Sequence, residues 1–172
     1  MTEASPILHP ITHDDFLIAV QALARAVEAD DWRPAMVVGI GRGGLVPAVY
    51  LSHRLNLPML SVDYSSLSAD AALVDVAARS AAGTDLLIVD DINDSGGTIA
   101  QLRARLTASG ADAARLRFAV LLDNGRSGER VDYRADIIDR ATDKRWFVFP
   151  WEALATQQAI VDEATSLPHR LA

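Results

Sequence analysis

The sequence contains no cysteine, no run of basic residues and no long uninterrupted apolar segment. Without cysteine there can be no disulfide framework and no thiolate metal site, which fits a reducing compartment such as the cytoplasm. A net charge of -7, with no gathering of basic residues, would repel a phosphate backbone and argues against nucleic acid as a partner. The most membrane-like stretch, 35–51, is interrupted by Arg42, four glycines and Pro47, so we expect neither a signal peptide nor a membrane span.

The chain is long enough for one sizeable core. Its 172 residues are 50% hydrophobic, and we expect a single domain over 1–172. Helical periodicity alternates with short branched-apolar runs, which predicts an α/β fold with a mostly parallel sheet flanked by helices. Strands are expected at 35–40, 58–62, 86–89 and 116–122, with shorter candidates at 133–138 and 146–149.

Helices are expected between these strands. Thr12 and Asp15 form a capping box for a first helix, whose packing face is Phe16, Val20, Leu23, Ala24 and Val27. Further helices are predicted at 45–55, at 97–109 with Gly110 as C-cap, and at 151–165. The Ser/Ala/Asp-rich stretch 65–84 suits either a mobile flap or a surface helix, and the sequence leaves both open.

A glycine-rich turn at 41–44 follows the first predicted strand. Residues 39–44 match the dinucleotide fingerprint G-x-G-x-x-G, with Asp63 downstream, so a nicotinamide-dependent enzyme is one interpretation. Arg42 inside the turn favours a second interpretation, a phosphate ligand gripped by the guanidinium and by nearby backbone amides. A plain strand-to-helix turn with a solvated arginine is the third.

The segment 86–99 combines a buried strand, a carboxylate pair, a third carboxylate and a small polar loop that enters a helix. Asp90 and Asp91, at the carboxyl end of a parallel strand, suit the vicinal hydroxyls of a ribose. The loop 95–98 offers consecutive amides, two hydroxyls and a helix N-terminus, which together suit a phosphate. The structural alternative is an Asp-rich turn with a helix cap at Asp94 or Ser95.

The segment 86–99 resembles the motif by which type I phosphoribosyltransferases bind 5-phosphoribosyl 1-pyrophosphate (PRPP). From about 14 to 152 the chain resembles the bacterial xanthine-guanine branch of that family. Residues 41–47 are similar to the pyrophosphate loop of this branch, and 146–152 to its base-stacking segment. The resemblance implies the family fold with a small base-binding hood, transfer of phosphoribosyl from PRPP to a purine, and a dimer or tetramer.

The resemblance also implies roles for individual residues. Asp94 would be catalytic, facing purine N7 as general base or proton holder. Magnesium would be held mainly by PRPP itself, with protein carboxylates helping through water or a single oxygen. The other positions are Asp90, Asp91, Ser95, Gly96, Gly97 and Thr98 for ribose and phosphate, Arg42 and Gly43 for pyrophosphate, Trp146, Phe147 and Asn124 for the base, and Asp90, Asp91 and Glu152 for the metal.

Two further features of the family have counterparts here. Its non-proline cis peptide would fall at Gly41-Arg42, and its flap would fall within 65–84. One departure concerns the base: members that use 6-oxopurines have a lysine after the fourth strand, whereas 121–125 contains none and Asn124 stands there. An asparagine amide can donate or accept, and Asp123 would suit amino hydrogens, unless 123–125 is only a surface turn. The sequence therefore leaves the base open.

Three functions compete. The first is a purine-salvage enzyme, which the Arg42 turn and Asp94 favour. The second is a non-catalytic regulator that senses PRPP or nucleotides with the same fold, which the missing lysine keeps open. The third is a nicotinamide-dependent dehydrogenase, which leaves the string 90–98 unexplained.

Overall fold

Five parallel strands form the central sheet of the computed structural model, which describes residues 6–63 and 69–166. The strands follow the spatial order β3-β2-β4-β5-β6, and every neighbouring pair is parallel. They are β2 (Met36–Ile40), β3 (Met59–Val62), β4 (Leu86–Asn93), β5 (Leu116–Asn124) and β6 (Tyr133–Ile138). The predicted α/β class with a mostly parallel sheet is confirmed.

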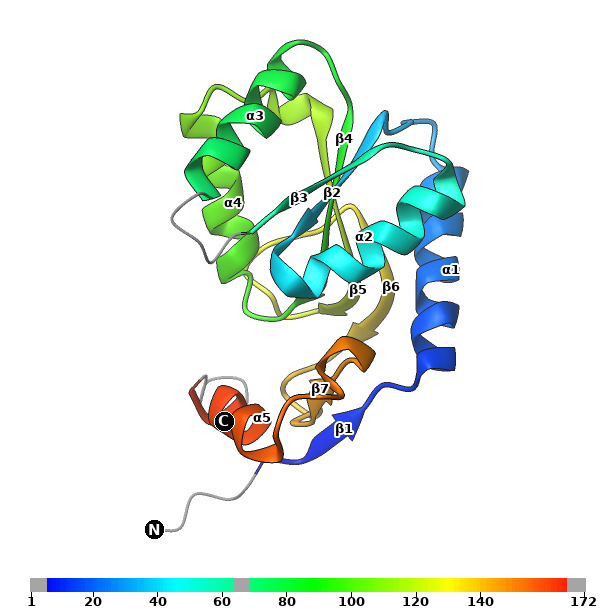
Figure 1. Ribbon diagram of the computed structural model, residues 1–172, viewed down its shortest axis with the longest axis vertical. Coiled ribbons are helices and arrows are strands. Elements are labelled where there is room, and N and C mark those ends of the chain that lie inside the picture. The colour runs from blue at the N-terminus through cyan, green and yellow to red at the C-terminus, as the bar shows by residue number, and fades with distance from the viewer. Residues whose placement is uncertain (1–5, 64–68, 167–172) are drawn as a thin grey trace.

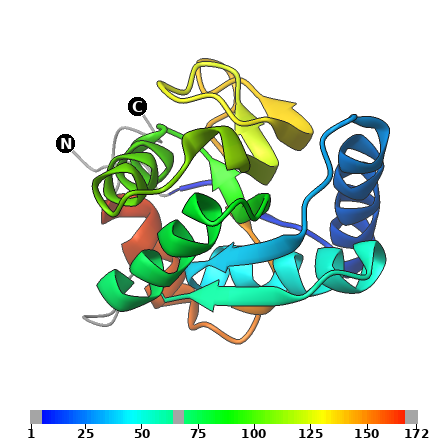
Figure 2. The same cartoon turned by 90° about the horizontal axis from the view of Figure 1, so that it is seen from above.

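Helices cover both faces of this sheet, as Figures 1 and 2 show. They are α1 (His13–Ala29), α2 (Gly41–Leu55), α3 (Ala69–Ala81) and α4 (Gly97–Ala108), with a short 3-10 helix η1 (Ala113–Arg115) before β5. Side chains alternate between the faces along each strand. In β4, Leu87 and Val89 pack with α1 and α2, whereas Leu86 and Ile88 pack with α3 and α4. Each face therefore has its own apolar core.

The first helix forms as its sequence predicts. Thr12 is the N-cap, and its hydroxyl oxygen accepts a hydrogen bond from the Asp15 amide at 3.1 Å. The buried residues of α1 are the five predicted for its packing face: Phe16, Val20, Leu23, Ala24 and Val27. Local periodicity was sufficient here because the helix buries a single stripe against the sheet.

A second, smaller unit lies beyond the carboxyl ends of the main strands (Figure 1). Its strands β1 (Leu8–Pro10) and β7 (Trp146–Val148) pair in parallel, so the start of the chain joins a segment from near its end. The 3-10 helix η2 (Pro150–Glu152) and helix α5 (Gln157–Ser166) follow β7. This unit is the predicted hood, although β1 was not predicted and β7 lies outside the main sheet.

Several predicted boundaries change. β4 continues to Asn93 rather than ending at Val89, because its polar end still pairs with β5, where Asn93 lies opposite Asp123. β5 likewise reaches Asn124, so a turn over 123–125 is wrong for its first two residues. The single helix predicted over 151–165 is wrong too: η2 and α5 are separate, and the Thr156 hydroxyl accepts from the Ala159 amide as the second helix begins.

The glycine-rich segment 41–44 is the first turn of α2 rather than a loop before a helix at Leu45. The chain leaves β2 at Gly41, whose φ of 58° makes the bend, and helical hydrogen bonding starts at once. The described residues contain no cis peptide bond, so the cis peptide expected at Gly41-Arg42 is not present.

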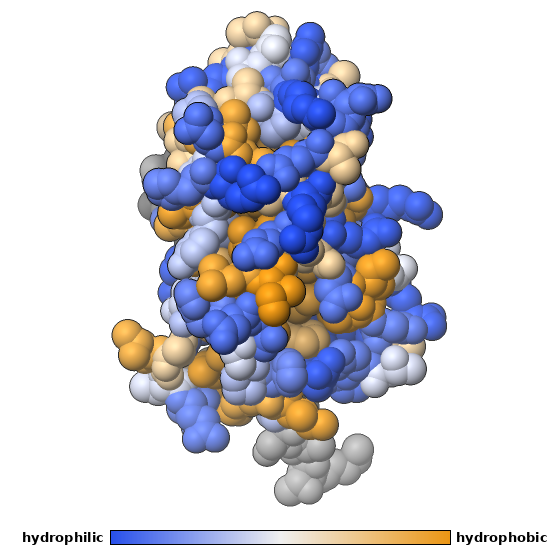
Figure 3. All heavy atoms as spheres, turned by 90° about the vertical axis from the view of Figure 1, so that its right-hand side faces the viewer, coloured by the Kyte–Doolittle hydropathy of each residue, from blue (hydrophilic) through white to orange (hydrophobic). Residues whose placement is uncertain are grey.

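The stretch 65–84 contains α3, which packs Leu73, Val76 and Ala77 into the core beneath it. The helix interpretation therefore holds for Ala69–Ala81, and the part of the predicted flap at 65–68 lies outside the described residues. Figure 3 shows the side of the molecule that carries α1, where apolar and polar side chains are interspersed. Among the described residues, no helix is long and apolar enough to span a membrane.

Candidate active site

The two sequence motifs meet at one edge of the sheet. β2 and β4 are parallel neighbours, with Gly39 opposite Val89, so the segments that leave their carboxyl ends lie side by side. One is the Arg42 turn that opens α2, and the other is the carboxylate string that leads into α4. In open α/β sheets, ligands bind at this edge, outside the carboxyl ends of the strands.

The motifs also touch. A Cβ at Gly43 would collide with the carboxylate of Asp91, so the absence of a side chain lets the acidic strand end approach α2. The Asp90 carboxylate accepts a hydrogen bond from the Asp91 amide at 3.0 Å, and the Asp91 carboxylate accepts one from the Ile92 amide at 2.8 Å. These local contacts orient both carboxylates at the sheet edge.

The loop 95–98 opens α4 as predicted, although its N-cap is Gly96, which has no side chain, rather than Asp94 or Ser95. The connection between β5 and β6 braces this loop. Gly128 donates its backbone amide hydrogen to the Ser95 carbonyl at 3.2 Å, and the side-chain Nδ2 of the buried Asn93 donates to the Glu129 carbonyl at 2.9 Å. The Gly97 amide also donates to the Ser95 hydroxyl oxygen at 3.3 Å. The helix N-terminus, a kind of site that suits an anion, is thus held in place.

Two adjoining cavities lie at this edge, of about 220 and 730 Å³. Both are lined by Asp90, Asp91, Thr98, Glu152 and Glu163. The smaller cavity is completed by residues that are mainly aromatic or apolar: Ile92, Arg140, Trp146, Phe147 and Phe149. The larger one extends over the start of α2 and is bounded by Arg42, Gly43 and α5. The carboxylate pair therefore stands between an aromatic compartment and the Arg42 turn.

Asp94 has a partner that the sequence did not indicate. The Arg140 guanidinium donates to both carboxylate oxygens of Asp94, from Nε at 3.1 Å and from Nη2 at 2.8 Å. Both residues are buried, at 4% and 9% exposure. Asp94 is absent from the described walls of both cavities, whereas Arg140 lines the smaller one. The catalytic role of Asp94 stays a prediction, and the group that reaches the cavity is Arg140.

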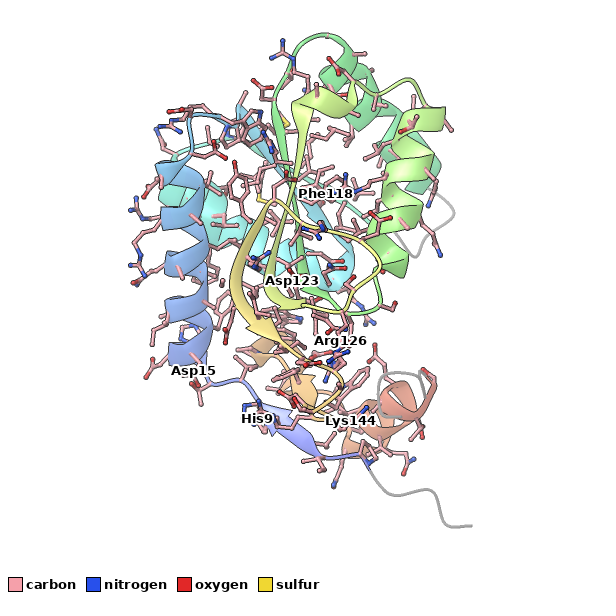
Figure 4. All side chains as sticks on the ribbon, turned by 180° about the vertical axis from the view of Figure 1, so that it is seen from behind. His9, Asp15, Phe118, Asp123, Arg126 and Lys144 are labelled. Atoms are coloured by element: carbon pink, nitrogen blue, oxygen red, sulfur yellow. The ribbon has the colours of Figure 1, made fainter. Side chains whose placement is uncertain are left out.

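Asn124 is buried at the end of β5 and organises this ion pair. Its Nδ2 donates to the Asp94 carbonyl at 2.9 Å, while its Oδ1 accepts from the amides of Arg126 and Arg140. Figure 4 shows Asp123 at this end of β5, with Arg126 beyond it toward the hood. These hydrogen bonds occupy much of the Asn124 side chain. The predicted contact between Asn124 and the base stays a prediction.

Trp146 and Phe147 both line the smaller cavity and are otherwise buried. Trp146 packs with Val148 and Ala164 in the core of the hood. The same side chain therefore belongs to the core and also lines the cavity. The Phe147 ring lies 5.2 Å from the guanidinium carbon of both Arg140 and Arg145. Asp143 binds Arg145, which lowers the pKa of Asp143 to about 2.

Glu152 joins the two cavities and also caps η2, where its carboxylate accepts from the Phe149 amide at 2.8 Å. Burial raises the pKa of Glu152, the Phe149 hydrogen bond and Arg42 oppose this, and Glu163 adds to it. Glu163, on α5, also lines both cavities, and the sequence did not indicate it. Its position depends on where α5 of the hood lies relative to the sheet edge.

Magnesium would meet only a partial ligand set. In the described ranges, 6–63 and 69–166, no group of three or more His, Asp or Glu side chains could hold a metal by itself. Asp90, Asp91 and Glu152 nevertheless line the same cavities. This donor set fits an ion that retains waters and takes most of its ligands from a phosphorylated substrate.

Comparison with known proteins agrees with the fold. Residues 11–156 match the phosphoribosyl transferase domain family, so the chain belongs to that family. It is 28% identical over 122 residues to a xanthine-guanine phosphoribosyltransferase of Idiomarina loihiensis, a match that covers 67% of this chain and 70% of the relative. It is also 34% identical over 101 residues to a ribose-phosphate pyrophosphokinase of Granulibacter bethesdensis, of which only 33% is covered.

Solved structures show the same fold. A purine phosphoribosyltransferase from Pyrococcus horikoshii superposes with a TM-score of 0.63 at 24% identity, covering 86% of this chain and 96% of the other. A protein from Neisseria gonorrhoeae with bound ppGpp gives a TM-score of 0.68 at 20% identity, covering 98% of both chains. The type I phosphoribosyltransferase fold, close to the xanthine-guanine branch, is thus confirmed.

Proposed function

We propose that this protein is a magnesium-dependent phosphoribosyltransferase that transfers the phosphoribosyl group of PRPP to a purine base. The observation that carries the proposal is the pair of adjoining cavities with Asp90 and Asp91 in their shared wall. One compartment has the aromatic walls that suit a planar base, and the other has the Arg42 turn that suits a diphosphate.

The substrates would occupy these compartments as follows. The ribose hydroxyls donate to Asp90 and Asp91, and the 5'-phosphate binds the start of α4 through backbone amides and the hydroxyls of Ser95 and Thr98. Arg42 and the neighbouring amides bind the pyrophosphate. The base lies against Trp146.

Transfer forms a bond between a base nitrogen and the anomeric carbon while the bond from that carbon to pyrophosphate breaks. The leaving group takes the electron pair, and the base loses a proton. The protein contributes by aligning the reactants, holding charge where it develops and excluding water. Magnesium, held beside Asp90, Asp91 or Glu152, would neutralise charge on the diphosphate when bound.

A binding and turnover panel tests the proposal. Magnesium-PRPP should raise the melting temperature, with a gain of about 2.7 kcal/mol at a hundredfold excess over the dissociation constant, whereas NAD should not. Pyrophosphate release should then require both PRPP and one of guanine, xanthine, hypoxanthine or adenine. Stabilisation by NAD alone would instead favour the dinucleotide interpretation of 39–44.

A second candidate is a regulator that senses PRPP or nucleotides without catalysis, and the neighbour with bound ppGpp favours it. The two differ in one measurement. A sensor would be stabilised by PRPP or a guanine nucleotide and would release no pyrophosphate with any base. A role in purine salvage, a cytoplasmic location and a homo-oligomer belong to the first proposal.

A further inference from the structure

The smaller cavity contains one positive charge among its described lining residues, and this charge is Arg140. Arg140 follows β6, in the connection to the hood, and its side chain is 10% exposed. The other charged residues of the lining are Asp90, Asp91, Glu152 and Glu163. A molecule that enters this compartment therefore meets a guanidinium on one side and carboxylates on the sides shared with the larger cavity.

The guanidinium is fixed in position by several hydrogen bonds. Asp94 accepts from Nε and from Nη2, and the backbone carbonyls of Asp143 and Arg145 accept from Nη1 at 3.2 and 2.5 Å. An arginine guanidinium has five N–H hydrogens: one on Nε, two on Nη1 and two on Nη2. The contacts above use the Nε hydrogen, both Nη1 hydrogens and one of the Nη2 hydrogens. None of these contacts uses the second hydrogen on Nη2.

We infer that Arg140 contacts the base and determines which base is accepted, and that Asp94 acts through Arg140 as its counter-ion. This inference rests on the proposed function. Arginine donates hydrogen bonds but cannot accept them, so a carbonyl oxygen or ring nitrogen facing Nη2 is bound and an exocyclic amino group is rejected. A rejected group leaves a buried donor unpaired, which discriminates more strongly than a mismatch in an apolar pocket.

The inference also accounts for the missing lysine. The residues that end β5, Asp123 and Asn124, bring no positive charge, and Asn124 instead binds the backbone of both Asp94 and Arg140. The cation of the base compartment comes from the connection after β6. The compartment should therefore favour oxopurines such as guanine and hypoxanthine over adenine at the position facing Arg140.

The experiment compares three variants with the wild type: Arg140→Gln, Arg140→Lys and the control Arg145→Gln. Arg145 lies at the same 5.2 Å from the Phe147 ring and also pairs with an aspartate, but it is absent from the described cavity walls. Binding of GMP and AMP is measured by calorimetry, and turnover is measured with guanine and adenine. The binding measurement needs no turnover, so it remains informative if the proposed transferase activity is absent.

The wild type should bind GMP in preference to AMP. Arg140→Gln should lose roughly 10- to 100-fold in GMP affinity, the range expected for one charge-assisted hydrogen bond, and much of the preference. Arg140→Lys should keep part of the preference, because it still donates, and Arg145→Gln should keep all of it. PRPP affinity should change little in any variant. An unchanged GMP-to-AMP ratio in Arg140→Gln, or an equal loss in Arg145→Gln, would overturn the inference.

A double variant separates recognition from folding. Arg140→Gln alone removes the charge that the buried Asp94 carboxylate contacts at 2.8 Å, which destabilises the protein. Combining it with Asp94→Asn removes both charges. If Asp94 acts through Arg140, the double variant binds GMP no worse than Arg140→Gln. A further loss of roughly 100-fold or more in turnover on adding Asp94→Asn would instead show that Asp94 acts on the base directly.

Discussion

The Asp91 carboxylate occupies the space that a side chain at position 43 would need. This contact joins the strand that carries the carboxylate pair to the helix that carries Arg42, across neighbouring strands of the sheet. Glycine at 43 is thus a condition for bringing the predicted ribose and pyrophosphate sites together, and the relationship can be tested by adding a single methyl group.

Gly43→Ala should weaken PRPP binding, because the new methyl group displaces Asp91 or shifts the first turn of α2. The matched control is Gly125→Ala, where an added Cβ meets nothing closer than the Ile137 side chain at 3.5 Å. We expect a loss of tenfold or more in PRPP affinity for the first variant, using about 1.4 kcal/mol per factor of ten, and little change for the second. Equal PRPP affinity in both variants would show that Asp91 moves aside freely.

Arg42→Ala should distinguish ligands that carry a diphosphate from those that do not. Arg42 is exposed at the start of α2 and lines only the larger cavity. Its removal should weaken the binding of PRPP and of pyrophosphate by about 1.5–3 kcal/mol and leave the binding of a nucleoside monophosphate nearly unchanged. Calorimetric titration of the three ligands measures this, with Arg33→Ala as a control outside the cavities. An equal loss for all three ligands would remove Arg42 from the pyrophosphate site.

Local sequence predicted the parts of the fold that depend on local pattern, such as the packing face of α1 and the continuous buried run that begins β4. It did not predict β1, because a three-residue strand carries almost no signal of its own and forms only by pairing with β7. The boundary errors have a related cause: the polar ends of β4 and β5 look like loops until their pairing is seen.

The site shows the same division. The string 90–98 and the Arg42 turn were recognisable because each is a contiguous motif, and the sheet brings them to one edge. Arg140 was missed because it meets Asp94 across 46 residues of sequence, and an Asp-Arg pair after a strand suggests only a surface turn. Long-range ion pairs of this kind leave no pattern in a single sequence.

Glu152 gives a prediction about pH. Burial raises its pKa, so the folded protein holds the proton more tightly than the unfolded chain. Stability from this group is then complete below the ordinary pKa of 4.5 and is lost as pH rises through the folded-state pKa. Glu152→Gln stays neutral and can still accept from the Phe149 amide. Its melting temperature, relative to wild type, should therefore be higher near about pH 7 than near about pH 4.

Glu163→Gln is the control for that measurement, because Glu163 contributes only a secondary rise in the Glu152 pKa. Without Glu163 the pKa of Glu152 is raised less, so less stability is lost as pH rises. The melting temperature of Glu163→Gln, relative to wild type, should therefore also be higher near about pH 7 than near about pH 4, but by less than that of Glu152→Gln. A relative melting temperature for Glu152→Gln that does not change with pH would mean that the carboxylate titrates alike in the folded and unfolded chain.

The last prediction concerns the stability of the Asp94–Arg140 pair. If Asp94 were only a helix cap, Asp94→Asn would be nearly silent, because asparagine caps about as well as aspartate. The N-cap of α4 is Gly96, however, and Asp94 is the buried partner of Arg140. Removing one charge of a buried pair typically destabilises a protein by about 3–5 kcal/mol. The denaturant concentration at the unfolding midpoint should therefore be markedly lower for Asp94→Asn than for wild type.

Removing both charges should cost less than removing one, since no buried charge is then left without a partner. Denaturant unfolding of Asp94→Asn, Arg140→Gln and the double variant therefore gives a direct test, with the double variant more stable than at least one of the singles. Magnesium-PRPP should still stabilise all three, because Asp90, Asp91 and the start of α4 are unchanged. Strictly additive losses would show that Asp94 and Arg140 stabilise the fold independently, despite the 2.8 Å contact between them.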